Sequence, residues 1–183
     1  MKFGVNTFIW VSPFRTEVFD VVQRVADLGF DVIEIAFEQP DLIDIKKLKS
    51  IIKDSGLEVA TCGVFGLDRD LISEELRKRQ NSKNYVKQCL DYASELEAPV
   101  LCGPVYSAVG KTCLVNPEEK AVEWERAIEG LSELGDYAQK RGVTIALETL
   151  NRFENSFMNI ASDLKELIKD VNHNAVKAHL DTF

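Results

Sequence analysis

Two acidic residues, Glu148 and Asp181, stand at the ends of short apolar runs, where a carboxylate can take part in chemistry. We expect residues 143–148 and 176–181 to be successive strands of a parallel sheet, and the interval between them fits one strand–helix–strand unit. The carboxyl ends of such strands meet at one rim, where the catalytic groups of α/β barrels lie. Two carboxylates on neighbouring strands can share a divalent cation. The alternative is that each residue only caps the turn that follows its strand.

The elements that would position these two residues alternate along the chain. Short apolar runs predict strands, and longer stretches with apolar residues near a 3.6-residue spacing predict helices between them. Gly29, Gly56 and Gly142 follow helical stretches, and glycine commonly ends a helix. The expected strands cover residues 2–9, 31–37, 57–62, 99–103, 143–148 and 176–181, and the expected helices cover residues 16–28, 41–55, 74–96, 117–141 and 161–171. This alternation predicts a parallel sheet in one domain that spans residues 1–183.

The pattern within the strands favours a barrel over a doubly wound sheet. Val143, Ile145 and Leu147 are apolar, whereas the residues between them are small or polar. One face of the sheet is therefore suited to packing helices, and the other tolerates polar groups, as a barrel interior does near its mouth. A doubly wound sheet is covered on both faces and reads as continuous apolar runs. No G-x-G-x-x-G or Walker loop follows the first strand, which disfavours a nucleotide-binding sheet. We expect an α/β fold, a TIM barrel (β/α)8 with about six of the eight units present.

The composition disfavours several classes of partner. The 183 residues include 22 basic and 30 acidic ones, and the formal net charge of −8 disfavours binding to a phosphate backbone. No apolar run approaches the ~20 residues of a membrane span, and we expect no signal peptide, because residues 1–4 run directly into a strand pattern. The four cysteines form no C-x-x-C pair, and a chain of this length needs no disulfides. We expect a cytoplasmic protein with reduced cysteines that binds neither nucleic acid nor membrane.

Two motifs near the end of the chain carry a resemblance to a known family. The stretch ETLNRFEN at residues 148–155 resembles the E-x-x-N-R-F-E signature of the D-tagatose 3-epimerase family, whose members are ketose 3-epimerases with a xylose isomerase-like barrel. The stretch HLDTF at residues 179–183 resembles the L-D-T-F-H segment of that family and ends before its histidine. The interval between the motifs agrees as well. Residues 28–35 and 98–100 are also similar, in a way that is generic to such barrels.

The resemblance implies a metal-dependent epimerase that inverts C3 of a free ketose, of the D-tagatose, D-fructose or D-psicose type. Glu148 would be both a metal ligand and a catalytic acid/base, and Asp181 would be a second ligand of Mn²⁺, Co²⁺ or Mg²⁺. Such an ion stabilises an enediolate by bridging the C2 carbonyl oxygen and the C3 hydroxyl. One carboxylate would remove the C3 proton, and another would return a proton on the opposite face.

Four further residues are expected to contact the substrate. By the resemblance, Glu154 would hydrogen-bond the hydroxyl end of the ketose, and Asn6 and Pro104 would line the sugar site. Trp10 follows the first strand at the rim, where we expect it either to form an apolar side of the pocket or to cover the top of the barrel. Glu34 faces the expected interior, either beside the pocket or paired with a basic residue.

The sequence also departs from the family pattern. Val109 stands near the point where the family has an aromatic residue that packs on the sugar, so Tyr106 or Trp10 would have to replace it. Asn6 stands where several relatives have an aromatic residue. The family draws a histidine, a second metal-binding glutamate and hence the second acid/base from strands seven and eight, and the chain has neither strand. We therefore expect these 183 residues alone to be inactive, to bind metal weakly and to form homo-oligomers.

Other functions fit the residues less well. Another sugar or hydroxypyruvate isomerase of the same superfamily is the second enzyme candidate, but residues 148–154 favour the epimerase. A DNA-repair nuclease on this barrel would need several zinc-binding histidines and a basic groove, and the chain has two histidines and a negative charge. The remaining alternative is an inactive barrel fragment.

Overall fold

A computed structural model describes residues 1–182 and places the strands in one parallel sheet. Its strands follow the order of the sequence, and each is paired in parallel with the next. The strands are β1 Gly4–Asn6, β2 Val32–Phe37, β3 Glu58–Gly63, β4 Val100–Gly103, β5 Thr144–Glu148 and β6 Val176–His179. A doubly wound sheet reverses its strand order at a switch point, whereas the order here runs one way, as in a barrel. This confirms the expected architecture, a partial TIM barrel with six strands.

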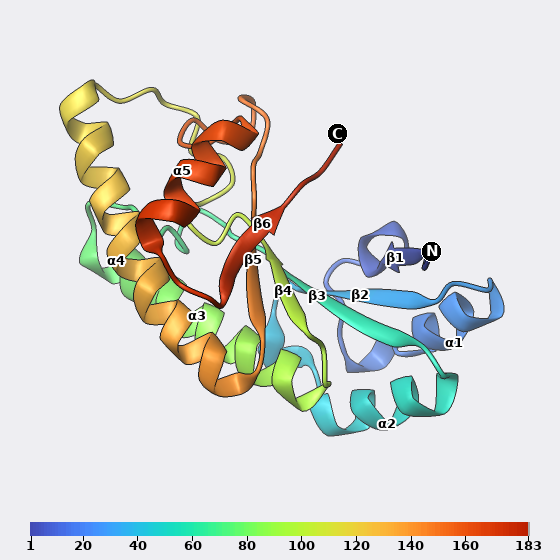
Figure 1. The fold of residues 1–183 in the computed structure, drawn as a ribbon. Helices are drawn as coiled ribbons and strands as arrows, with labels where there is room; N and C mark the ends of the chain where they lie inside the picture. The colour runs from blue at the N-terminus through green and yellow to red at the C-terminus, as the bar shows by residue number, and fades with distance from the viewer. Residues whose placement is uncertain (183) are drawn as a thin grey trace.

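The α-helices lie along one side of this curved sheet (Figure 1). They are α1 Asp20–Asp27, α2 Ile45–Ser55, α3 Leu76–Glu95, α4 Pro117–Arg141 and α5 Ala161–Val171. The main apolar core fills the layer between these helices and the strands, and it includes Ile33, Ile35, Leu101 and Ile145. Burial of this apolar surface is the main contribution to stability. Within residues 1–182, no helix is both long and apolar enough to cross a membrane.

Local signals set the ends of the best-defined helices. Asn116 begins α4 with a capping box: its Oδ1 accepts a hydrogen bond from the Glu119 backbone at 2.8 Å, and the Glu119 carboxylate accepts one from the Asn116 backbone. Pro117 occupies the first turn, and Gly142 ends the helix at a φ of 70°, a left-handed conformation that glycine adopts without strain. The expected bounds of α4 and α5 are confirmed.

The expected bounds near the amino terminus and in β6 are wrong in part. The first strand ends at Asn6 and not at residue 9, because the Asn6 side chain accepts a hydrogen bond from the Phe8 backbone at 2.8 Å and starts a 3₁₀ turn. The first helix begins at Asp20, after a separate 3₁₀ turn. The last strand ends at His179, so Asp181 lies in the segment beyond it.

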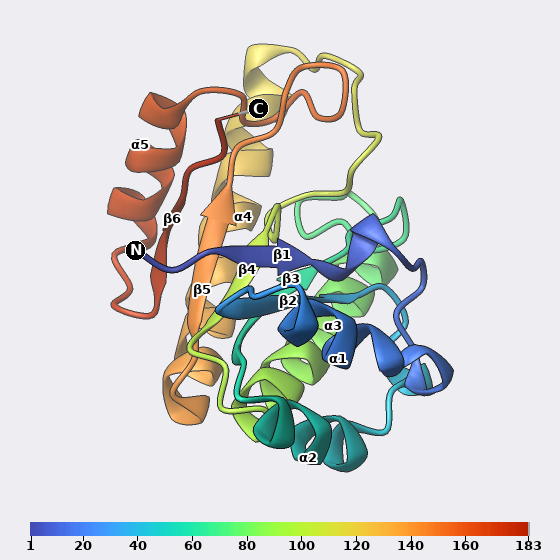
Figure 2. The same ribbon diagram turned by 90° about the vertical axis from the view of Figure 1, so that its right-hand side faces the viewer.

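Two long loops extend past the carboxyl ends of the strands and lie beside each other. The loop of residues 104–116 follows β4, and the loop of residues 149–160 follows β5. An isolated parallel bridge pairs Lys111 with Asn155, one residue from each loop. Figure 2 shows both loops beyond the strand ends, close to the start of α4. These loops bring the conspicuous motif of residues 148–155 to the rim of the sheet.

Candidate active site

The polar candidates face the side of the sheet opposite the helices, which we call the inner face. Because side chains alternate along a strand, Glu34 points away from Ile33 and Ile35, which belong to the main core. The strand register then aligns Asn6 with Glu34, and Glu148 with His179. Between these pairs the inner face is covered by a separate small apolar cluster of Ala36, Cys62, Cys102 and Ala146. All four of these side chains are small and buried.

Glu148 and Asp181 come together at the rim. Glu148 is the last residue of β5 and is half-buried, whereas Asp181 is exposed in the segment after β6. Burial raises the pKa of the Glu148 carboxyl, and Asp181 raises it further through its charge and as a hydrogen-bond partner. Glu34 adds a smaller effect of the same sign, and the His179 imidazole opposes them. A carboxyl group whose neighbours are also acidic holds its proton more tightly than usual.

The donor set of this pair fits part of a divalent metal site. Two carboxylates on adjacent strand ends offer the oxygen ligands that Mg²⁺ and Mn²⁺ prefer. A nearby cation would also relieve the repulsion that raises the pKa of Glu148. Among residues 1–182, no group of three or more histidine, cysteine, aspartate or glutamate side chains is placed to hold a metal ion. Among the described residues, Glu148 and Asp181 are therefore a candidate pair of metal ligands and not a complete site.

Asn6 belongs to a hydrogen-bonded group on the other side of the inner face. Its amide nitrogen donates to the Glu34 carboxylate and to the Cys62 sulfur at 3.3 Å. The Cys102 thiol donates to the second oxygen of Glu34 at 3.6 Å. Glu34 is therefore paired with an amide and a thiol rather than with the basic residue considered as one alternative. Burial raises the pKa of both thiols far above neutral pH, so they are protonated and not nucleophiles.

Glu154 lies in the loop after β5, with its side chain exposed to solvent. Its carboxylate accepts a hydrogen bond from the Asn151 amide at 2.5 Å, a contact within the same loop. Its backbone carbonyl accepts a hydrogen bond from Gly110 at 2.7 Å. The carboxylate is thus accessible to a ligand while the backbone is attached to the neighbouring loop.

The other predicted contact residues are placed differently. Pro104 is buried directly after β4, and Trp10 is half-buried at the end of the first 3₁₀ turn, packed against the main core. Tyr106 is completely buried against Phe157, so it is not available to pack on a sugar. Val109 is exposed at the rim. Of the two residues expected to replace an aromatic contact, only Trp10 retains accessible surface.

The sequence patterns did not single out two polar residues at the rim, Glu38 and His179. Glu38 directly follows β2, the kind of position that singled out Glu148, and one of its carboxylate oxygens accepts a hydrogen bond from Ser12 at 2.8 Å. Its other oxygen is buried and has no hydrogen-bond partner among residues 1–182. The same is true of Nδ1 of His179, which neighbours Glu148 in the register. An acidic residue immediately after a strand was the signal that could have identified Glu38.

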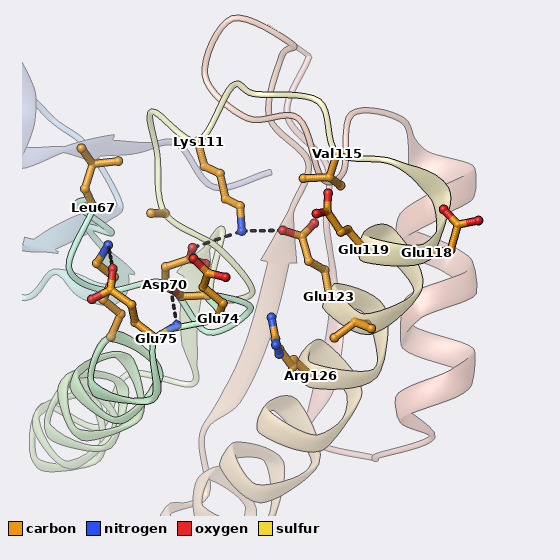
Figure 3. A pocket seen from close by; sticks show the side chains of 14 residues that line it. Leu67, Asp70, Glu74, Glu75, Lys111, Val115, Glu118, Glu119, Glu123 and Arg126 are labelled. Carbon is orange, nitrogen blue, oxygen red and sulfur yellow. Dashed lines mark hydrogen bonds and ion pairs between the residues drawn. The ribbon is translucent and has the colours of Figure 1, made fainter.

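A cavity of about 640 Å³ lies away from Glu148, between the start of α3, the start of α4 and the loop after β4 (Figure 3). Lys111 extends into it between Asp70 and Glu123, whose carboxylates lie 3.2 Å and 2.6 Å from its ammonium nitrogen. Both carboxylates are buried. The ammonium group at the centre of this cavity is therefore already paired with two carboxylates.

Comparison with known proteins agrees with this geometry. A D-psicose 3-epimerase of Agrobacterium fabrum is 30% identical over 190 residues, and one of Ruminiclostridium cellulolyticum is 31% identical over 188 residues. Both matches cover 100% of this chain, and 64% and 63% of the relatives. A crystal structure of D-psicose 3-epimerase with D-tagatose from Clostridium cellulolyticum H10 superposes with a TM-score of 0.86 at 30% identity, over 100% of this chain and 64% of that one.

The chain thus spans less than two thirds of the length of these relatives. The resemblance to ketose 3-epimerases that the two motifs indicate is confirmed along the whole chain. A family model described as a xylose isomerase-like TIM barrel matches residues 22–183. The chain belongs to the xylose isomerase-like TIM barrel family.

Proposed function

We propose that the protein to which this chain belongs is an isomerase that inverts C3 of a free ketose, with a divalent metal ion as cofactor. The observation that carries the proposal is the meeting of Glu148 and Asp181 at the ends of adjacent strands on a polar inner face. The relatives named D-psicose 3-epimerase support ketoses as the substrate class. D-tagatose, D-fructose and D-psicose are the ketoses to test first.

Glu148 would move the proton at C3. A general acid or base works best when its pKa lies near the operating pH, and the pKa of Glu148 is shifted upward by burial and by its acidic neighbours. Because its pKa is raised, the ionised Glu148 carboxylate is a stronger base than an ordinary glutamate. Asp181 would act as a ligand beside it and hold its own charge close to the reacting oxygens.

A divalent ion held by Glu148 and Asp181, with Mn²⁺, Co²⁺ or Mg²⁺ as candidates, would supply positive charge that stabilises the enediolate form of the ketose. The chain's own residues would orient the sugar. Glu154 has the exposed carboxylate needed to accept hydrogen bonds from the distal hydroxyls, and Trp10 offers an apolar surface at the rim. Asn6 and Pro104 would border the site in the positions that they already hold in the structure.

The test is an assay of the protein expressed from its complete gene, with each ketose in D₂O and added Mn²⁺. A 3-epimerase incorporates solvent deuterium at C3 and yields the C3 epimer, which NMR detects. Glu148→Gln should abolish the exchange, whereas Glu166→Gln, an exposed change on α5, should leave it intact. Formation of an aldose that carries deuterium at C2 would identify a ketose–aldose isomerase instead. The absence of exchange with every ketose and metal would refute the proposal.

A further inference from the structure

The loop that carries Glu154 is joined to the loop after β4 by several hydrogen bonds. Gly110 donates its backbone N–H to the Glu154 carbonyl oxygen at 2.7 Å, and Ser156 donates its own to the Lys111 carbonyl at 2.9 Å. The Ser156 hydroxyl donates to the carbonyl oxygen of Cys113 at 2.8 Å. Glu154 and Ser156 are therefore both fixed to a second loop.

Asn155 is the buried centre of this contact. Its side chain is 0% exposed, and its amide nitrogen donates to the Ser107 hydroxyl at 3.2 Å and to the Ala108 carbonyl at 3.0 Å. Its amide oxygen accepts from the backbone of Phe157 at 2.8 Å and of Met158 at 3.4 Å. One end of the amide thus binds the neighbouring loop, and the other end shapes its own loop. No donor or acceptor capacity remains for a ligand.

Lys111 fixes the partner loop on its far side. Its backbone pairs with Asn155 in the isolated bridge, and its ammonium group lies between the carboxylates of Asp70 and Glu123 (Figure 3). Asp70 belongs to the segment after β3, and Glu123 belongs to α4. Buried carboxylates hold a paired lysine strongly, since separating them would leave unpaired buried charge. The loop after β4 is therefore a firm support for the loop after β5.

We propose that Asn155 is a positioning residue that sets where Glu154 stands relative to Glu148. This inference rests on the proposed function, in which Glu154 binds the ketose. The Glu154 carboxylate is exposed and contacts only its own loop among the described residues, so its own contacts do not fix it against the sheet. Its place is set by the backbone, and Asn155 is the fully buried side chain that attaches that backbone to the loop after β4. A small displacement of a substrate-binding group costs affinity because the geometry of the bound state is lost.

A double-mutant cycle in the complete protein tests this role. Asn155→Asp keeps an oxygen for Phe157 and Met158 and removes both donors to the neighbouring loop, while Glu154→Gln removes the charged contact itself. We expect Asn155→Asp alone to raise KM about tenfold with little change in kcat, as for the loss of one charged hydrogen bond. In the Glu154→Gln background the same change should raise KM no further, because residues that act through one contact are not additive. Affinity for Mn²⁺ should stay unchanged in every variant.

Ser107→Ala gives a second test that does not place a carboxyl group in a buried site. It removes one acceptor of the Asn155 amide, and it should raise KM in the same direction and accelerate hydrogen exchange at the Gly110 amide in the complete protein. Equal rises in KM for Asn155→Asp in both backgrounds would overturn the positioning role and leave Asn155 purely structural. An unchanged KM in Glu154→Gln alone would instead refute the substrate role of Glu154, and the proposed function in that respect.

Discussion

The hydroxyl group of Tyr106 donates a hydrogen bond to the backbone carbonyl oxygen of Glu148, with 2.7 Å between the two oxygens. Tyr106 is completely buried, and its ring packs against Phe157. The bond connects the loop after β4 to the last residue of β5, where that strand's backbone leaves the sheet. A tyrosine that sequence reasoning considered for stacking on a sugar therefore holds the backbone of the proposed catalytic residue.

Tyr106→Phe should weaken both the fold and the metal site. The change leaves a part-buried carbonyl without this donor, and an unsatisfied group costs up to roughly 1–3 kcal/mol in the free energy of unfolding. Because Glu148 loses a fixed backbone, we also expect a lower affinity for Mn²⁺. Urea titration and calorimetry measure the two effects. Tyr85→Phe is the control: its hydroxyl accepts a bond from the Val64 backbone at 2.7 Å and donates to the Phe37 carbonyl, and neither bond involves Glu148, so it should lower stability alone. Equal metal affinity in Tyr106→Phe and the parent would contradict the argument.

The chain should bind Mn²⁺ weakly through Glu148 and Asp181. Two carboxylates are fewer ligands than a tight site needs, and the described residues hold no larger cluster. Titration calorimetry of the chain should show a weak site that disappears in Glu148→Gln and in Asp181→Asn. The exposed Glu166→Gln change should have no effect. Tight binding that survives Glu148→Gln would remove this residue from the site.

Stability without metal should depend on pH through Glu148. Its pKa is raised above the usual 4.5 by burial first and by Asp181 and Glu34 after it. The folded state then holds this proton more tightly than the unfolded state, so stability falls as pH rises from about 4.5 through the folded pKa. Glu148→Gln should be the more stable form above this window and lose its advantage below it. Urea titrations from acidic to neutral pH, with a chelator present, compare the two. A difference that grows toward acid pH would reverse the assigned sign.

The regular elements were predictable because their causes are local. The capping box of Asn116, the glycine after α4 and the alternation of Val143, Ile145 and Leu147 are all visible in the sequence, and the structure follows them. The meeting of Glu148 with Asp181 followed from the rule that parallel strands end at one rim.

Other features depend on contacts between distant segments and could not be predicted. The 3₁₀ turn that shortens β1 arises from the side chain of Asn6, which also binds Glu34 across the sheet. The complete burial of Tyr106 requires the loop after β5 to cover it, and the pairing of Lys111 with Asn155 joins two loops of irregular structure. No periodicity encodes such contacts.

In the complete protein, Glu154→Ala should impair substrate binding and leave the metal in place. The carboxylate is exposed and has no contact with Glu148 among its hydrogen bonds. Loss of a charged hydrogen bond to the sugar costs roughly 1.5–3 kcal/mol, so we expect a higher KM and a kcat/KM about 10- to 100-fold lower. Metal content, measured by elemental analysis, should equal that of the parent. Loss of metal in this variant would show that Glu154 serves the ion and not the ketose.

The sheet of residues 1–182 is open, and its two edges determine whether the isolated chain associates with other copies. The strand order places β1 and β6 at the edges, where backbone N–H and C=O groups lack a neighbouring strand. Phe3 and Leu180, each close to an edge, are 59% and 67% exposed. Edges of this kind pair with other chains, and a barrel removes them only by closing on itself.

We therefore predict that the isolated 183-residue chain associates or exchanges elements between copies, and that it does not epimerise ketoses. The resemblance to the family assigns the second acid/base carboxylate to a later strand, so one of the two proton transfers would lack its group. Light scattering with assays on D-tagatose and D-fructose measures both properties. Ala178→Lys adds a charge to the exposed end of β6 and should reduce association, whereas Ala121→Lys on the exposed face of α4 should not. A stable monomer that converts ketose would contradict both the edge argument and the need for a second carboxylate.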